Sequence, residues 1–185
     1  DAALNAAQGV ILQERLDHLL AFDESTGILR CESAVSLGDI LEHFLPRGYA
    51  PAVTPGTRCI SLGGAIASDV HGKNHHRDGT ISSQLLDFSL LTAAGEILTC
   101  SRETNPELFW ASLGGMGLTG VILDARLRLR RIETSFMRVV TERAPDLDGV
   151  LERMSRGDAE HAYSVAWIDC LASGAALGRS VLMRA

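Results

Sequence analysis

The sequence predicts an α+β fold, in which strands that follow one another in the chain pair antiparallel and a few helices pack against the sheet. Two strand pairs support this prediction. Apolar segments at 19–23 and 28–32 flank a turn, and segments at 85–93 and 96–100 flank a second turn at Ala94-Gly95. Helical patterns do not alternate regularly with these strands, which argues against a doubly wound sheet.

Two helices have clear boundary signals. The first has apolar residues at helical spacing from 37 to 45. Ser36 precedes it as an N-cap with Asp39 three residues later, which is the pattern of a capping box. Gly48 ends the segment, because glycine readily adopts the left-handed conformation of a helix terminus.

The second helix is expected at 107–113. Asn105 precedes it as an N-cap, Pro106 occupies the first helical position, and Gly114 follows its end. The remaining elements form a longer set, read from apolar periodicity: extended segments at 50–54, 120–130, 136–141 and 162–169, and helices at 61–68 and 147–155.

We place a domain boundary near Glu133, where the strand at 120–130 ends and the composition changes. The chain starts at Asp1 without an initiator methionine and ends in a strand-like segment, so we expect it to be part of a longer protein.

Composition excludes several classes of protein. The 185 residues carry a formal net charge of -6, which gives no electrostatic reason to bind nucleic acid. No segment approaches the roughly 20 apolar residues that a transmembrane helix needs. The four cysteines have neither paired spacing nor a zinc-site pattern, so a reducing compartment suits them.

The segment from Pro55 to His76 is the most informative part of the chain. Glycine, alanine and serine predominate between 61 and 68, and we expect their backbone N–H groups to be open to a closely approaching flat ligand. A polar cluster follows directly at 71–76. Its histidines raise the alternative of a metal site, although Gly72 interrupts the helix that would bring them together.

A second glycine motif is easily misread. Residues 115–120 match the G-x-G-x-x-G dinucleotide pattern. That pattern needs a strand before it and a helix after it, whereas here a helix precedes and a strand follows. We therefore interpret these glycines as a turn from helix to sheet.

The segment 63–76 resembles the flavin-binding segment of the vanillyl-alcohol oxidase and p-cresol methylhydroxylase type of FAD enzymes. Within this family it is most similar to the oxidase subunits of decaprenylphosphoryl-β-D-ribose 2′-epimerases. The similarity continues through the turn at 55–58, the hairpin at 90–96, and the segments 107–120 and 164–169.

The resemblance implies a partial p-cresol methylhydroxylase-type FAD-binding domain over 1–133, lacking its N-terminal part, and the start of a substrate-binding domain over 134–185. It implies FAD contacts at Asp1, Ala2, Gly56, Ser61, Leu62, Gly63, Gly64, Ser68, Asp69, Val70, His71 and Ile122. The backbone of Ile122 is expected at the adenine end.

The expected chemistry is oxidation of a secondary sugar hydroxyl to a ketone, with FAD held non-covalently. His71 is suited to line the flavin and hydrogen-bond the ring or the substrate, and Lys73 to hold a phosphate or stabilise negative charge on the ring. We assign these two residues to the catalytic site and expect no metal.

The resemblance implies a sugar or lipid-linked sugar substrate and a short-chain reductase as the partner that completes epimerisation. The implied location is cytoplasmic or peripheral at a membrane. Two alternatives stay open at this point. One is an alditol or aldonolactone oxidase of the same fold, and the other is a non-catalytic metal- or ligand-binding module that uses His71, His75 and His76.

Overall fold

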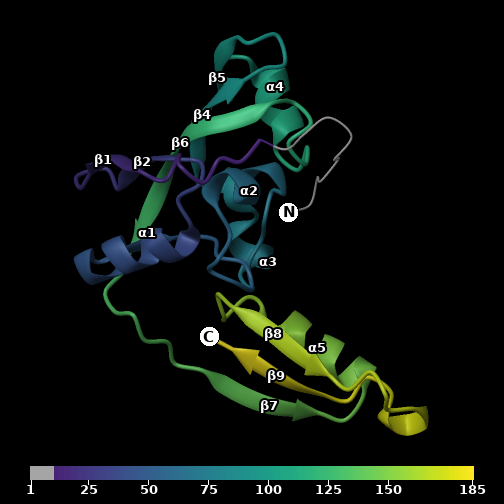
Figure 1. Cartoon of the computed structure of the whole chain (residues 1–185). Helices are drawn as coiled ribbons and strands as arrows, with labels where there is room; N and C mark the ends of the chain where they lie inside the picture. The colour runs from purple at the N-terminus through teal and green to yellow at the C-terminus, as the bar shows by residue number, and fades with distance from the viewer. Residues whose placement is uncertain (1–10) are drawn as a thin grey trace. The chain divides into compact units, whose positions relative to one another are not determined.

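The computed structural model describes residues 11–185, and these form two compact units (Figure 1). The first unit extends to Gly72 and resumes from Gly79 to Glu133. The second contains Lys73–Asp78 and Thr134–Ala185. The predicted residues Asp1 and Ala2 lie outside the described residues.

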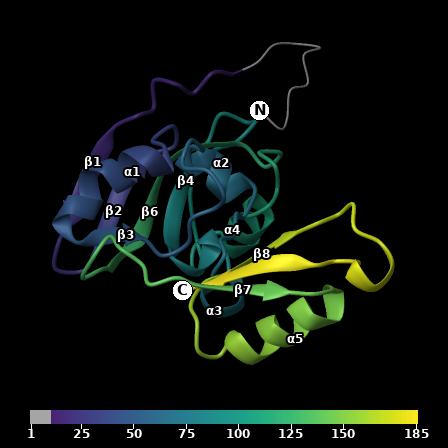
Figure 2. The ribbon, with the colours of Figure 1, turned by 90° about the horizontal axis from the view of Figure 1, so that it is seen from below.

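The first unit is an antiparallel sheet with helices on one face (Figures 1 and 2). Its strand order is β1-β2-β6-β4-β5, and β3 pairs with β6. The strands are β1 (Leu19–Asp23), β2 (Ile28–Glu32), β3 (Tyr49–Pro51), β4 (Leu85–Leu91), β5 (Ile97–Ser101) and β6 (Val121–Arg131). The helices are α1 (Leu37–Phe44), α2 (Leu62–Ala67) and α4 (Pro106–Ser112), with short 3₁₀ turns at Leu45–Arg47 and Ile81–Ser83.

Alternation along β6 gives the sheet its two faces. Ala125, Leu127 and Leu129 are buried, whereas the arginines between them are exposed. The buried side chains join the core formed with the helices, where the rings of Phe88 and Phe109 stack at 5.6 Å. The sheet is therefore apolar towards its helices.

The opposite face of the same sheet carries cross-strand ion pairs. Arg126 Nε donates to Asp87 Oδ1 at 2.9 Å, and Arg30 Nε donates to Asp124 Oδ1 at 2.8 Å. These contacts hold adjacent strands in register, because each joins opposite charges on neighbouring strands.

The second unit is a three-stranded antiparallel sheet of order β7-β9-β8. It contains α3 (His75–Asp78), β7 (Val140–Ala144), α5 (Leu147–Gly157), β8 (Ser164–Ile168), a 3₁₀ turn at Gly174–Ala176 and β9 (Ser180–Arg184). Its small core joins Ala144, Val150 and Leu182 with Met154 and Ala166.

Most predicted elements are confirmed. The capping box of Ser36 and Asp39 is present, and Gly48 has φ +80 at the end of the following 3₁₀ turn. The order of helix, glycine turn and strand across 106–131 is also confirmed, which excludes a dinucleotide turn there.

Three predictions are wrong in detail. Asn105 has φ +48 and makes no side-chain cap; its Nδ2 donates instead to Thr99 O on β5. The strand expected at 136–141 lies at Val140–Ala144, where pairing with β9 decides the position, and the extended segment expected at 50–54 pairs only over Tyr49–Pro51. The absence of a continuous helix from His71 to His76 was expected from Gly72 and is confirmed, because the single helical turn of this segment covers only His75–Asp78.

Among the described residues, none of the helices has the length and hydropathy required to cross a membrane.

Gly120 tests the packing of β6 against β4. Its φ is +149, and a Cβ there would clash with the carbonyl oxygen of Leu91. We expect Gly120→Ala to lower the free energy of unfolding by about 3 kcal/mol or more, because strain and a backbone clash combine.

Gly95→Ala is the matched control for Gly120→Ala. Gly95 has φ +83, and no described heavy atom lies within 4 Å of the place that a Cβ would occupy, so only the conformational cost of about 1 kcal/mol remains. Denaturant unfolding of both variants measures the difference; equal losses would contradict the assigned clash.

Candidate functional site

Helix α2 presents a surface made of very small residues. Leu62, Ala65 and Ile66 point into the core. The remaining positions are glycine, alanine and serine, with Gly64 and Ser68 exposed one turn apart. A planar ligand could therefore approach this side of the helix closely.

Main-chain pairing fixes α2 to the rest of the first unit. The Leu62 and Gly63 amides donate to Val35 O and Ser33 O, both at 2.8 Å. A Cβ at Gly63 would lie 3.0 Å from Ser33 Cβ, so the absence of a side chain permits this close approach. The start of α2 is thus held against the segment after β2.

These bonds correct one part of the sequence interpretation. The N–H groups of Leu62 and Gly63 were expected to be open to a ligand, but both are used by carbonyls within the chain. The Gly64 amide donates to the Ser61 hydroxyl at 3.3 Å, which caps the helix. A flat ligand can therefore approach the surface of α2 closely, but the start of the helix does not present a row of free amides to it.

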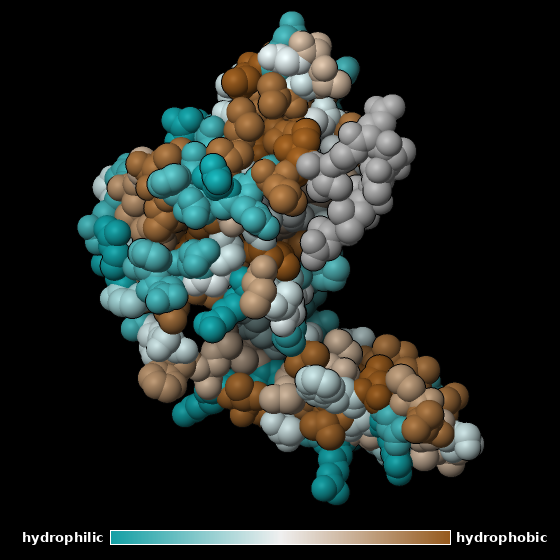
Figure 3. All heavy atoms as spheres, viewed as in Figure 1, coloured by the Kyte–Doolittle hydropathy of each residue, from teal (hydrophilic) through white to brown (hydrophobic). Residues whose placement is uncertain are grey.

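The C-terminal end of α2 is joined to the second glycine segment. The Gly114 amide donates to Ile66 O at 3.3 Å, and the Met116 amide donates to Ala67 O at 2.8 Å. Met116 is 42% exposed and Leu118 is 87% exposed, and Figure 3 shows apolar surface over α4 and its surroundings.

Sequence reasoning left Met116 and Leu118 out of the candidate site. In the sequence, residues 115–120 were interpreted only as a turn that resembles a dinucleotide motif. Their glycines are nevertheless a signal that the backbone packs closely against another segment. The contact with α2 extends the candidate site along this loop.

Asp69 and Val70 continue the segment after α2. Asp69 has φ +42, and its Oδ1 accepts the Ser82 amide at 3.3 Å. Val70 O accepts the Ile81 amide at 2.9 Å. The turn is therefore held in place by the segment that precedes β4.

Ile122 lies on β6 beside an irregularity in its pairing with β4. Leu90 pairs with Ile122 and Ser89 pairs with Asp124, so Leu123 is an extra residue on β6. Leu123 O accepts the Ser33 amide at 2.9 Å, and Ser33 O accepts the Gly63 amide. This chain of bonds connects the neighbourhood of Ile122 to the start of α2.

The two predicted catalytic residues belong to different units. His71 is exposed and forms an isolated β-bridge with Thr80 in the first unit. Lys73, which is exposed, belongs to the second unit, where its carbonyl accepts the Ser164 amide at 2.9 Å. No local sequence signal indicates this division.

Gly56 is exposed, and no described heavy atom lies within 4 Å of the place that a Cβ would occupy there. The turn that contains it leads into Arg58 and Ile60, whose carbonyls accept the Gly38 and Leu37 amides at 2.8 and 3.0 Å. These hydrogen bonds join the turn that contains Gly56 to the N-terminus of α1.

Within residues 11–185, the one group of three side chains that could surround a metal ion is Asp17, His18 and Glu32. It does not include the histidines at 71–76. The His18 and Glu32 side chains already contact each other, with Nδ1 and Oε2 2.7 Å apart on the protein surface. The structure therefore gives no support to the metal-binding alternative at the polar cluster.

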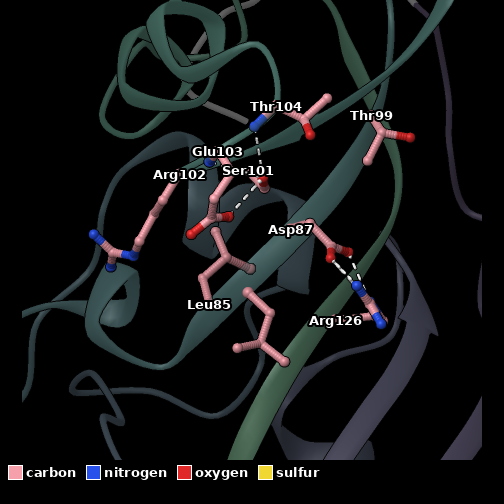
Figure 4. Close-up of a pocket in the computed structure, with 9 residues that line it drawn as sticks. Leu85, Asp87, Thr99, Ser101, Arg102, Glu103, Thr104 and Arg126 are labelled. Atoms are coloured by element: carbon pink, nitrogen blue, oxygen red, sulfur yellow. Dashed lines mark hydrogen bonds and ion pairs between the residues drawn. The ribbon is translucent and has the colours of Figure 1, made fainter.

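A cavity of about 370 Å³ lies beside β4 and β5 (Figure 4), and none of the predicted site residues lines it. The Asp87–Arg126 ion pair forms part of its wall. The Ser101 hydroxyl accepts the Glu103 and Thr104 amides at 3.1 and 2.9 Å. Because these polar groups bind one another, we do not assign a ligand or a reaction to this cavity.

The second unit has a smaller cavity of about 250 Å³ on its sheet. Trp167 and Arg143 line it, together with Asp169 and Arg179. The last two form an ion pair with a 2.7 Å contact, which lowers the pKa of the Asp169 carboxyl.

The fold and its small-residue helix fit an FAD-binding protein, and sequence comparison shows this family. Residues 2–101 match the family model described as an FAD binding domain, and the chain belongs to that family. FAD is its cofactor, and the predicted resemblance is confirmed.

Three relatives illustrate the range of the family. Decaprenylphosphoryl-beta-D-ribose oxidase of Mycolicibacterium smegmatis is 36% identical over 100% of this chain and 40% of its own length. L-gulonolactone oxidase of Scyliorhinus torazame is 28% identical over 75% of this chain and 32% of its own length. Cytokinin dehydrogenase 2 of Arabidopsis thaliana is 37% identical over 49% of this chain and 18% of its own length. The chain thus spans well under half of these relatives.

The residues present fit a flat cofactor. The nearest atom to a Cβ built at Gly64 is Ser61 Oγ at 3.1 Å, so a larger side chain there would extend over the exposed side of α2. Gly56 is more open, with no described heavy atom within 4 Å of a built Cβ, and the serines at both ends of α2 can provide hydroxyl groups.

Gly64→Leu tests this surface. We expect flavin affinity to fall at least about tenfold, because the leucine would cover the small-residue side of α2. Equilibrium titration of the apoprotein with FAD, followed by fluorescence, measures the effect.

Ser155→Leu, at an exposed position of α5, is the matched control. Its flavin affinity should equal that of the parent protein. Unaltered affinity in Gly64→Leu, with both variants folded, would remove α2 from the cofactor site.

His18 provides a pH test of the first unit. Its hydrogen bond with Glu32 is the main cause that raises the His18 pKa above 6.5, followed by the charges of Glu32 and Asp17. Hydrogen bonds from the His18 backbone and then its side chain lower the Glu32 pKa below 4.5.

The stabilisation that His18 contributes is complete below pH 6.5 and is lost as the pH rises through the raised His18 pKa. The stabilisation that Glu32 contributes is present above pH 4.5 and is lost as the pH falls through the lowered Glu32 pKa. The pair therefore contributes most between these pH values. NMR titration should show the His18 pKa falling towards 6.5 in Glu32→Gln, and an unchanged titration would exclude the pairing.

Proposed function

We propose that this chain carries the FAD-binding part of an oxidase that converts a secondary hydroxyl of a sugar to a ketone. The preferred substrate is the ribose 2′-hydroxyl of a polyprenylphosphoryl-β-D-ribose. The observation that carries the proposal is the small-residue surface of α2, in a chain 36% identical over its whole length to a relative named decaprenylphosphoryl-beta-D-ribose oxidase.

We assign residues 1–133 to the FAD-binding domain and 134–185 to the beginning of the substrate-binding domain. The FAD contacts proposed from the resemblance are Asp1, Ala2, Gly56, Ser61, Leu62, Gly63, Gly64, Ser68, Asp69, Val70, His71 and Ile122. When bound, FAD would accept the hydride from the carbinol carbon. Cofactor binding is proposed to be non-covalent.

In this assignment α2 and the 114–120 loop exclude water from one side of the cofactor by close packing. His71 hydrogen-bonds the flavin ring or the substrate hydroxyl. Lys73 provides a cation for the substrate phosphate or for negative charge on the ring. The cavity beside Trp167 and Arg143 supports a substrate role for the second unit, since it combines an aromatic surface with a guanidinium.

A short-chain reductase is proposed to return the ketone to an alcohol and complete epimerisation. The lipid chain of the substrate implies peripheral contact with a membrane. An alditol or aldonolactone oxidase is the second candidate, and the similarity to L-gulonolactone oxidase favours the lactone.

Substrate turnover distinguishes these candidates. The purified flavin-loaded protein is given polyprenylphosphoryl ribose, L-gulonolactone or an alditol, with an artificial electron acceptor. We expect the highest kcat/KM with the lipid-linked ribose. Faster turnover of the lactone or alditol would favour the second candidate, and a protein without a flavin absorbance band would contradict both.

His71→Ala tests the proposed catalytic role. Loss of a hydrogen bond to the reacting groups should lower kcat by about a hundredfold or release the flavin. Steady-state kinetics and the flavin-to-protein absorbance ratio measure the two effects. His43→Ala, which changes an exposed histidine on α1, is the control and should retain both properties.

A further inference from the structure

Residues 73–78 leave the first unit and pack within the second. The bridge between His71 and Thr80 closes the base of this excursion in the first unit. Beyond that base, the Ser164 amide of β8 donates to Lys73 O at 2.9 Å. Ser164 is the first residue of β8, and Figure 1 shows α3 near this end of the strand. The peptide that carries Lys73 is therefore attached to β8.

The contact lies on the outer edge of the sheet. In the order β7-β9-β8, the strand β8 has β9 on one side. Lys73 O accepts its hydrogen bond on the other side and so satisfies a backbone donor at the sheet edge. A shift of this segment would leave the Ser164 amide without that acceptor.

Asn74 organises the turn that follows Lys73. Asn74 is fully buried, and its Nδ2 donates to Asp78 Oδ2 at 2.6 Å. Its carbonyl accepts the Arg77 and Asp78 amides at 3.0 and 2.8 Å. These three bonds close the single turn of α3, which is too short to be stable by itself.

His76 attaches this turn to another part of the second unit. Its Nε2 lies 3.0 Å from His161 O. Because a carbonyl oxygen can only accept, the contact requires a proton on Nε2 of His76. One side chain thus connects α3 to the segment that leads into β8.

We propose that His76 is a positioning residue for Lys73. Its bond to His161 O keeps α3 in place, and α3 keeps the Lys73 peptide paired with Ser164, so the second unit fixes the backbone position from which the exposed Lys73 side chain extends. The consequence for turnover rests on the proposed function, in which Lys73 binds an anionic group. His76 itself need not touch substrate or cofactor.

The test compares His76→Phe, which keeps a ring without the donor, with His76→Gln, which retains an N–H donor. His161→Ala is the matched control, because the acceptor is the backbone oxygen and survives the substitution. Asp78→Ala removes the acceptor of Asn74 and loosens the same turn from its other end. All variants are measured as the flavin-loaded protein, and thermal unfolding identifies any that do not fold.

Two readouts are compared. Hydrogen exchange of the Ser164 amide should accelerate by about fivefold to tenfold in His76→Phe and Asp78→Ala, as expected for loss of one hydrogen bond. The KM for polyprenylphosphoryl ribose should rise by about tenfold in the same variants, with flavin content unchanged. His76→Gln and His161→Ala should resemble the parent protein in both readouts.

Unchanged Ser164 exchange in His76→Phe would overturn the proposal, and so would faster exchange with an unchanged KM. Failure of His76→Gln to restore the parent values would also exclude the donor role. If the parent protein oxidises none of the sugars, the proposed function fails, while the exchange measurement still decides whether His76 holds the Lys73 peptide.

Discussion

The main-chain contact between segments 33–38 and 58–63 is the constraint on which the first unit depends. It joins the end of β2, the start of α1 and the start of α2 through backbone bonds, including those from Leu62 to Val35 and from Gly63 to Ser33. A Cβ at Gly63 would lie only 3.0 Å from Ser33 Cβ, so this close approach favours glycine there. The small-residue helix can therefore present its other side to a ligand while its start is fully hydrogen-bonded.

This constraint also explains how the site and the sheet are connected. Ser33 donates to Leu123 O on β6 and accepts from Gly63 on α2, so one residue joins the helix to the strand that carries Ile122. At the other end of α2, Met116 and Gly114 attach the loop before β6. The candidate cofactor surface is thus held at both ends by elements distant in sequence.

Local signals were sufficient for most of the fold. The capping box of Ser36 and Asp39, the turn at Gly95 and the alternation of β6 each act over a few residues, and the structure confirms the elements they predict. Asn105 shows the limit of such signals, because its side chain bonds Thr99 on another element instead of capping its own helix. The sequence predicted which segment forms the candidate site, but it did not predict that Val35 and Ser33 accept the hydrogen bonds of the Leu62 and Gly63 amides.

The sequence by itself determined that the chain is α+β, that residues 61–68 form a helix of small residues, and that its motifs resemble those of FAD enzymes. Only the tertiary structure decided which donors of that helix are already used and that Lys73 pairs with Ser164 while His71 pairs with Thr80. The physical reason is that caps and periodicity depend on neighbours in the chain, whereas these hydrogen bonds join segments whose proximity arises only on folding.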